Sequence, residues 1–167
     1  MTAKYAYPFS SIRGDYIRSI GGVVLCLSPF ALGLPLTGAL YLVAFAALVF
    51  AVLLARTILR HVTAVTVSDG EITLKSLQEQ AVPWEGLAEF DLSYFTTWRS
   101  GSNGWMQLRL RGAGKTLRLE SSVDGFEEIT RSCFDAARRN KLELNRTTLS
   151  NLAALGIVSE EEAMAPV

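Results

Sequence analysis

The feature that most constrains this chain is a long uncharged segment near its N-terminus. It runs from Ser19 to Ala55 and is interrupted near its middle by the turn-like string GLPLTG, residues 33 to 38. A bilayer core needs roughly 20 apolar residues per helix, so this length predicts two crossings joined by a tight turn. We place the crossings at residues 16–34 and 38–58 of a transmembrane hairpin, 16–60, that follows an N-terminal cytoplasmic or interfacial segment, 1–15.

Two other interpretations of the apolar segment are less consistent with the sequence. A buried soluble hairpin would normally show a polar face, and ALYLVAFAALVFAVLLA shows none. The small residues ALG at 31–33 are compatible with signal-peptide cleavage, but a long, partly aromatic segment precedes the apolar run and a second apolar segment follows it at once.

The charges that flank the apolar segment predict its orientation. The chain has no net charge, yet its basic residues dominate the first sixty positions, and the turn between the two spans is uncharged. Lys and Arg near the ends of spans favour the cytoplasmic side. We therefore expect a multi-pass membrane protein with both termini cytoplasmic, flanked by Arg13, Arg18, Arg56 and Arg60.

Small residues recur along both predicted spans at helical spacing. Because helices in lipid approach closely where side chains are small, these stripes predict the faces that pack together, although alanine is also simply a common helix former. The first stripe is Gly22, Cys26 and Gly33, and the second is Ala47, Ala51 and Ala55. Cys26 and Cys133 fall in different predicted environments, so we expect no disulfide between them.

From residue 61 onward the pattern changes to the alternation of β-strands. HVTAVTVS and EITLKSL are separated by the turn pair DG, which predicts a hairpin. QAVPWEGLAEFDLSYF predicts a short strand that ends at Pro83 and a longer one in which Ala88, Phe90, Leu92 and Tyr94 share one face. WMQLRLR and KTLRLES follow as two more strands.

The string RGAGKT, residues 111–116, is similar to the end of a phosphate-binding loop. Such a loop follows a strand, opens a helix and needs a further glycine five residues earlier. Arg109 occupies that position and a strand follows, so GAG is predicted to be a hairpin connection. We expect no nucleotide and no nucleic acid as partners.

The chain ends in helical patterns. Asp124 is expected to cap an amphipathic helix whose apolar stripe comprises Phe126, Ile129, Cys133, Phe134 and Ala137. Residues 143–167 are expected to add a short helix that stops at Gly156 and a frayed acidic tail.

About six antiparallel strands closed by one amphipathic helix, over residues 61–142, resemble the pleckstrin-homology-like (PH-like) domain of bacterial membrane proteins. The most family-like phrase is VPWEGLAEFDL, residues 82–92. The resemblance implies an antiparallel PH-like β-barrel or sandwich beside a membrane α-helical hairpin, in a multi-pass protein of the bacterial inner membrane. Lipid-binding members use basic residues in the first hairpin loop, whereas this loop is SDGE, so no ligand-binding residue is carried over.

Residues that could carry catalysis are sparse. His61 is the single histidine and follows Arg60 at the predicted membrane boundary, where a polar residue is ordinary. Glu89 and Asp91 alternate on one strand face, which pairing across a sheet explains. We expect no enzymatic activity, no cofactor and no metal site.

The outer face of the last predicted hairpin is basic. Arg109, Arg111, Lys115 and Arg118 could contact anionic lipid or an acidic partner. Alternatively, Glu89 and Asp91 pair with Arg109 and Arg111 and neutralise the sheet, which the matching alternation favours. The loop that contains Trp98 and Arg99 is a second candidate contact with the bilayer surface.

These patterns predict a non-enzymatic membrane protein whose cytoplasmic domain serves as a docking or assembly surface. Its expected partners are membrane lipids and either another membrane protein or further copies of itself. The alternative is that the domain senses anionic lipids, and the remaining possibility is an enzyme with an unfamiliar site.

Overall fold

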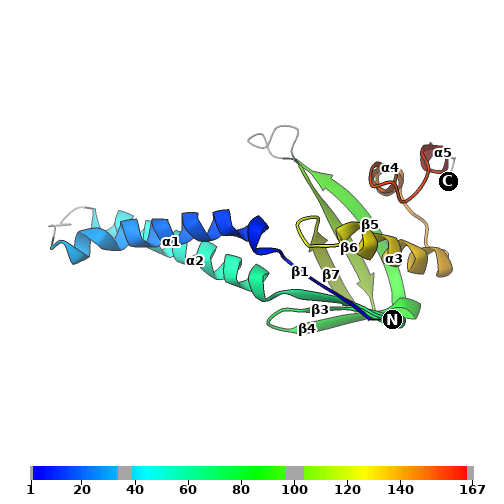
Figure 1. Cartoon of the computed structure of the whole chain (residues 1–167), viewed down its shortest axis with the longest axis horizontal. Helices are drawn as coiled ribbons and strands as arrows, with labels where there is room; N and C mark the ends of the chain where they lie inside the picture. The colour runs from blue at the N-terminus through cyan, green and yellow to red at the C-terminus, as the bar shows by residue number, and fades with distance from the viewer. Residues whose placement is uncertain (1, 34–38, 97–103, 165–167) are drawn as a thin grey trace. The chain divides into compact units, whose positions relative to one another are not determined.

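The computed structural model describes residues 2–33, 39–96 and 104–164. The chain divides into two compact units: Tyr7–Thr63 forms one, and Met1–Ala6 joins Ala64–Val167 to form the other (Figure 1). The sequence suggested that residues 1–15 would be a separate segment and that residues 143–167 would lie outside the main domain. Instead, both chain ends contribute to the second unit, while most of residues 1–15 belongs to the helical one.

The first unit is a helical hairpin. Helix α1 spans Phe9–Ala31 and helix α2 spans Leu40–Val62. α1 begins earlier than the span predicted at residues 16–34, because Pro8 holds an extended conformation and the helix starts directly after it. α2 continues past the predicted end at residue 58 into its basic last turn, which contains Arg60 and His61.

The two helices differ in how well they suit a bilayer. Within the described ranges, α2 is the one helix that is long and apolar enough to cross a membrane. Its most apolar stretch has a mean hydropathy of 2.5, and 6% of that stretch is buried inside the protein. The described part of α1 does not qualify, because its first turns carry Arg13, Asp15 and Arg18 and its uncharged part runs only from Ser19 to Ala31. The two predicted crossings are therefore not equivalent.

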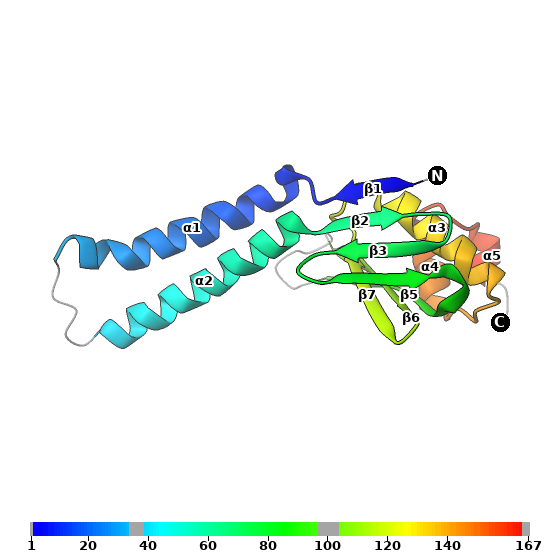
Figure 2. The same ribbon diagram turned by 90° about the horizontal axis from the view of Figure 1, so that it is seen from below.

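The second unit begins with a four-stranded antiparallel sheet. The helical hairpin separates the first of its strands from the other three in the sequence. The strands of this sheet, β1 (Ala3–Ala6), β2 (Ala64–Val67), β3 (Glu71–Lys75) and β4 (Glu79–Pro83), lie side by side in that order (Figure 2). β1 pairs with β2, and Lys4 lies opposite Thr66. The helical hairpin is thus an insertion between two neighbouring strands of one sheet.

A second antiparallel sheet follows the one-turn 3-10 helix η1 (Trp84–Gly86) and contains β5 (Leu87–Phe95), β6 (Trp105–Gly112) and β7 (Lys115–Glu120). The β6–β7 turn has positive φ at Ala113 and Gly114, which is the geometry of a tight hairpin, so RGAGKT forms a β-turn and not a phosphate loop. The two sheets remain separate and do not form a closed barrel, in contrast to one form of the expected fold.

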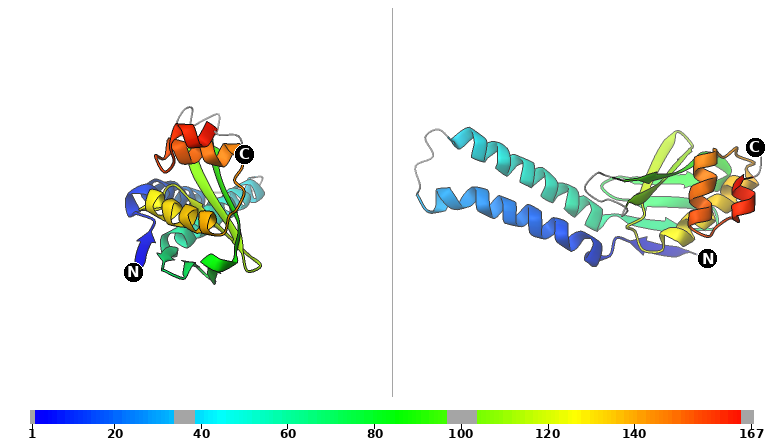
Figure 3. Two further views of the ribbon diagram at one scale, coloured as in Figure 1. Left: turned by 90° about the vertical axis from the view of Figure 1, so that its right-hand side faces the viewer. Right: turned by 90° about the horizontal axis from the view of Figure 1, so that it is seen from above.

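Three helices complete this unit: α3 (Phe126–Arg139), α4 (Arg146–Ala154) and α5 (Glu160–Met164), of which α4 and α5 pack side by side (Figure 3). The predicted apolar stripe of α3 is buried, and the Phe134 ring lies 6.3 Å from that of Phe90 on β5. Two expectations are wrong. Gly125, not Asp124, is the N-cap of α3, and part of the acidic tail forms α5. The fold is α+β with two antiparallel sheets.

Candidate functional site

The basic face predicted on the second sheet is largely neutralised by its own neighbours. Arg109 forms an ion pair with Glu89 and lies 3.7 Å from the Asp91 carboxylate. Arg111 lies 3.6 Å from Glu89 on the facing strand. The strand register produces these pairs, because Glu89 is opposite Arg111 and Asp91 is opposite Arg109. The alternative of a self-paired sheet therefore matches the contacts.

The other predicted contact residues are Lys115, Arg118, Trp98 and Arg99. Lys115 and Arg118 are exposed, and the register of β6 and β7 places Arg118 opposite Arg109, a residue of the same charge. Trp98 and Arg99 lie outside the described residues. Near that loop, Phe95 and Trp105 stack at 5.9 Å and are 41% and 37% exposed, so they leave aromatic surface open at this end of the sheet.

The outer edge of β5 is covered by α4. Thr148 is fully buried, and its hydroxyl accepts a hydrogen bond from the Leu92 amide and donates one to Asp91. The Asn151 amide donates to the Leu92 carbonyl at 2.7 Å. These side chains replace the backbone partners that a neighbouring strand would supply, which protects a sheet edge from pairing with other chains. The contacts of Asp91 and Leu92 with Thr148 and Asn151 thus have a structural role.

The predicted packing stripes of the hairpin are only partly correct. Gly22 is buried against the Phe50 ring, and Cys26 and Ala47 are half-buried. Ala51, Ala55 and Gly33 are exposed. The interface of α2 runs through Phe50 and Thr57, because the large ring fills the space that Gly22 leaves open, whereas Ala51 and Ala55 face outward.

At the basic end of the hairpin the charges meet across the two helices. Asp15 lies 3.5 Å from Arg18 on its own helix and 3.8 Å from Arg60 on α2, and the Arg60 guanidinium also lies over the Tyr7 ring. Arg13 and Arg56 are exposed. The Asp15 carboxylate therefore interacts with two arginines, Arg18 and Arg60.

His61 belongs to an aromatic cluster within the hairpin. Its Nδ1 is 3.0 Å from the Tyr16 hydroxyl, and its ring meets the Tyr16 ring edge-on. The centroid of the Phe9 ring lies 6.2 Å from that of His61. The histidine thus joins the ends of α1 and α2, a role that its position in the sequence did not reveal.

A groove of about 760 Å³ lies between the first sheet and α3. Trp84 lines the groove. Its indole N–H donates a hydrogen bond to the Ser68 carbonyl at 2.8 Å, and its own carbonyl accepts one from the Asn140 amide. Tyr5 forms one wall and donates its hydroxyl to Glu128. Burial, followed by the hydrogen bond to Glu128 and its negative charge, raises the pKa of Tyr5.

The charged lining of this groove is mainly acidic. Its exposed carboxylates come from the β2–β3 turn, η1 and α3, and among the described residues that line the groove Arg139 is the one cation. The acids are Asp69, Glu85 and Asp135. Sequence patterns did not reveal this groove, because β1 and α3 are more than a hundred residues apart; the WEG turn was the one available signal.

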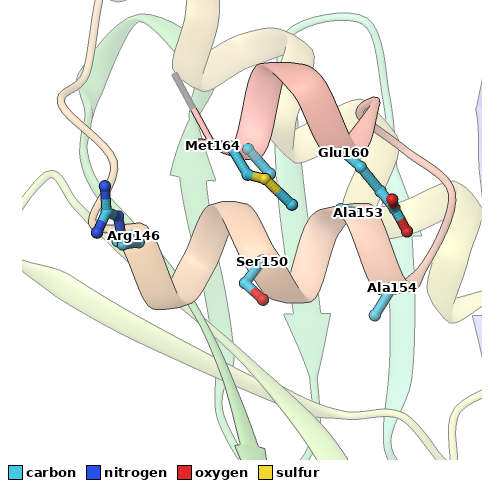
Figure 4. A pocket seen from close by; sticks show the side chains of 7 residues that line it. Arg146, Ser150, Ala153, Ala154, Glu160 and Met164 are labelled. Carbon is cyan, nitrogen blue, oxygen red and sulfur yellow. The ribbon is translucent and has the colours of Figure 1, made fainter. Parts of the chain in front are cut away.

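A second depression of about 670 Å³ lies between α4 and α5 and is lined by Met164 and several small side chains, with Arg146 and Glu160 toward its ends (Figure 4). Among the described residues, no three His, Cys, Asp or Glu side chains gather as a metal-binding group. Cys133 is buried, and burial raises the pKa of its thiol.

Comparison with family models, curated proteins and solved structures gives no match.

Proposed function

We propose that this chain is a non-enzymatic protein of the bacterial inner membrane, in which a helical hairpin anchors a cytoplasmic PH-like docking domain. The observation that carries the proposal is the pairing of β1 with β2 on either side of the hairpin. The docking surface is the acidic groove between the first sheet and α3, and its ligand is a basic segment of another membrane protein.

The surface of α2 supports insertion into lipid. Its side chains are apolar around most of its circumference, and large ones such as Tyr41, Leu42 and Phe45 are at least 66% exposed. A soluble protein rarely leaves such a continuous apolar surface in water. The small residue Gly22 lies inside the hairpin instead, which is the arrangement that lipid favours.

The connectivity supports an even number of crossings. β1 precedes the hairpin, β2 follows it, and the two strands exchange backbone hydrogen bonds in one sheet. If α2 alone crossed the bilayer, these strands would lie on opposite sides and could not pair. A hairpin whose two helices enter the bilayer and return keeps both strands in the cytoplasm.

The charge of the groove supports the choice of partner. Membrane proteins carry an excess of Lys and Arg in the short cytoplasmic segments beside their spans. A domain tethered to the same membrane meets these segments, and complementary charge both steers such encounters and fixes their register. Among the described residues that line the groove, carboxylates outnumber arginine, and Glu85 and Asp135 are exposed, which supports the required sign. The ion pairs of Arg109 and Arg111, by contrast, weaken the case for lipid sensing by the second sheet.

Charge reversal in the groove tests this proposal. The full-length protein in uncharged detergent should bind a fluorescent peptide of Lys, Arg and apolar residues, with an affinity that falls as salt rises. Glu85→Lys with Asp135→Lys should weaken binding at least tenfold. The control, Glu79→Lys with Glu143→Lys, makes the same change of charge at exposed acids outside the groove. Equal binding by both variants would refute the groove as the docking site.

A further inference from the structure

The basic end of the helical hairpin contains a cavity that no part of the proposed docking function uses. It has a volume of about 320 Å³ and lies between α1 and α2. Its lining repeats at helical spacing on both helices, so each helix presents one face to it. The lining residues are Asp15, Arg18, Ser19, Leu53, Arg56, Thr57 and Arg60.

The charges of this cavity are unbalanced. Arg18, Arg56 and Arg60 supply three guanidinium groups, and Asp15 supplies one carboxylate that interacts with Arg18 and Arg60. Arg56 is exposed, and no ion pair among the described residues involves it. Among the described residues that line the cavity, positive side chains therefore outnumber negative ones.

The neutral part of the lining does not offset this charge. Ser19 and Thr57 are buried, and their hydroxyls donate to carbonyl oxygens of their own helices, those of Asp15 and Leu53. These protons are already engaged, so the exposed guanidinium groups of Arg18 and Arg56 are the donors that remain for a ligand. Arginine presents several N–H groups in a planar fork, which suits the oxygens of a phosphate.

We propose that this cavity binds a phosphate group, and that its natural source is the headgroup of an anionic lipid. This inference rests on the membrane insertion of the hairpin. Arg18 and Arg56 are the charged residues that border the uncharged run of Ser19–Ala55, so the cavity lies where the chain passes from apolar to charged surroundings. Basic pockets between helices at the cytoplasmic face are suited to anionic headgroups.

The test uses the full-length protein, purified in uncharged detergent, with phosphatidylglycerol or phosphatidylcholine added and retained lipid counted by native mass spectrometry. Phosphatidylglycerol should be retained preferentially. Arg56→Gln should lower its affinity about fivefold, as expected for one cation near an anionic headgroup. Arg18→Gln with Arg56→Gln should lower the affinity further. Arg13→Gln removes an arginine of α1 that lies outside the cavity and should not change the affinity.

A variant of opposite sign separates lost binding from lost folding. Asp15→Asn removes the carboxylate that competes for Arg18 and Arg60 and should raise lipid affinity about fivefold. Equal losses in Arg13→Gln and Arg56→Gln, or weaker binding by Asp15→Asn, would overturn the proposal. Displacement of the lipid by millimolar inorganic phosphate would support the site and assign it to free phosphate as well, whereas lack of displacement would support the lipid alone.

Membrane fractionation distinguishes this inference from the proposed anchoring. If the wild-type chain remains in the membrane fraction while its lipid retention ignores the arginine substitutions, the cavity proposal fails and the anchor stands. If the wild-type chain is found in the soluble fraction without detergent, the anchor itself fails.

Discussion

Phe50 of α2 packs its ring directly over Gly22 of α1, so closely that a Cβ at position 22 would overlap the ring. Gly22→Ala should therefore separate the helices or displace Phe50, and we expect a loss of about 1–3 kcal/mol in the stability of the hairpin. Gly21→Ala is the matched control, since nothing lies within 4 Å of its added Cβ. Thermal unfolding of both full-length variants in one detergent measures the difference, and equal midpoints would contradict this packing.

The contact of β1 with α3 makes a similar prediction at the other unit. Gly125 has φ of +66° and lies against the Tyr5 ring, whereas Gly156 has the same φ and open space around it. Alanine at either position costs about 1–2 kcal/mol for the left-handed backbone. Gly125→Ala should cost about 1–3 kcal/mol more, because the methyl group also overlaps Tyr5. Denaturant unfolding compares the two, and equal losses would show that β1 does not dock there.

The edge of β5 depends on one buried hydroxyl. Thr148→Val keeps the side-chain shape but leaves the Leu92 amide without its acceptor, which should destabilise the domain by about 1–3 kcal/mol. Thr147→Val, at the exposed neighbouring position, should change stability by no more than about 0.5 kcal/mol. Hydrogen exchange at the Leu92 amide provides a local readout, and protection that survives Thr148→Val would refute the contact.

Tyr5 should make the stability of the domain sensitive to alkaline pH. Its pKa is raised in the folded state by burial and by Glu128, so folding favours the neutral phenol. The resulting stabilisation is fully present below the unfolded pKa of about 10 and is lost as pH rises through the folded pKa. Glu128→Gln should lower that pKa. Phenolate absorbance of the wild type minus that of Tyr5→Phe follows the titration, and a Tyr5 midpoint at or below the unfolded value would contradict the contact.

Local patterns predicted most elements of this fold. The alternation of Phe90, Leu92 and Leu108 identified strands, and the stripe of α3 identified its buried face. The pairing of Glu89 with Arg111 followed from the same alternation. Such signals depend on residues close in sequence, whose spacing alone fixes which face they share.

Features that depend on distant partners were missed. The four residues of β1 carry too little pattern to predict a strand whose partner, β2, follows the whole hairpin. A register shift between Leu87 and Glu89 leaves Ala88 exposed, whereas strict alternation placed it with Phe90. Likewise, the interface of α2 is set by the fit of Phe50 to Gly22, and the regular spacing of Ala51 and Ala55 carried no information about that fit.

Thiol labelling tests the central claim, that the hairpin enters the membrane from the cytoplasm and returns to it, most directly. Single cysteines at Lys4→Cys, Lys75→Cys and Leu32→Cys, each with Cys26→Ala and Cys133→Ala, mark the two flanks of the hairpin and the C-terminal end of α1. In bacterial spheroplasts treated with a membrane-impermeant maleimide, we predict that position 32 is labelled at once and that positions 4 and 75 are labelled only after permeabilisation. Labelling of positions 4 and 75 from opposite sides, or of position 32 only after permeabilisation, would contradict the account.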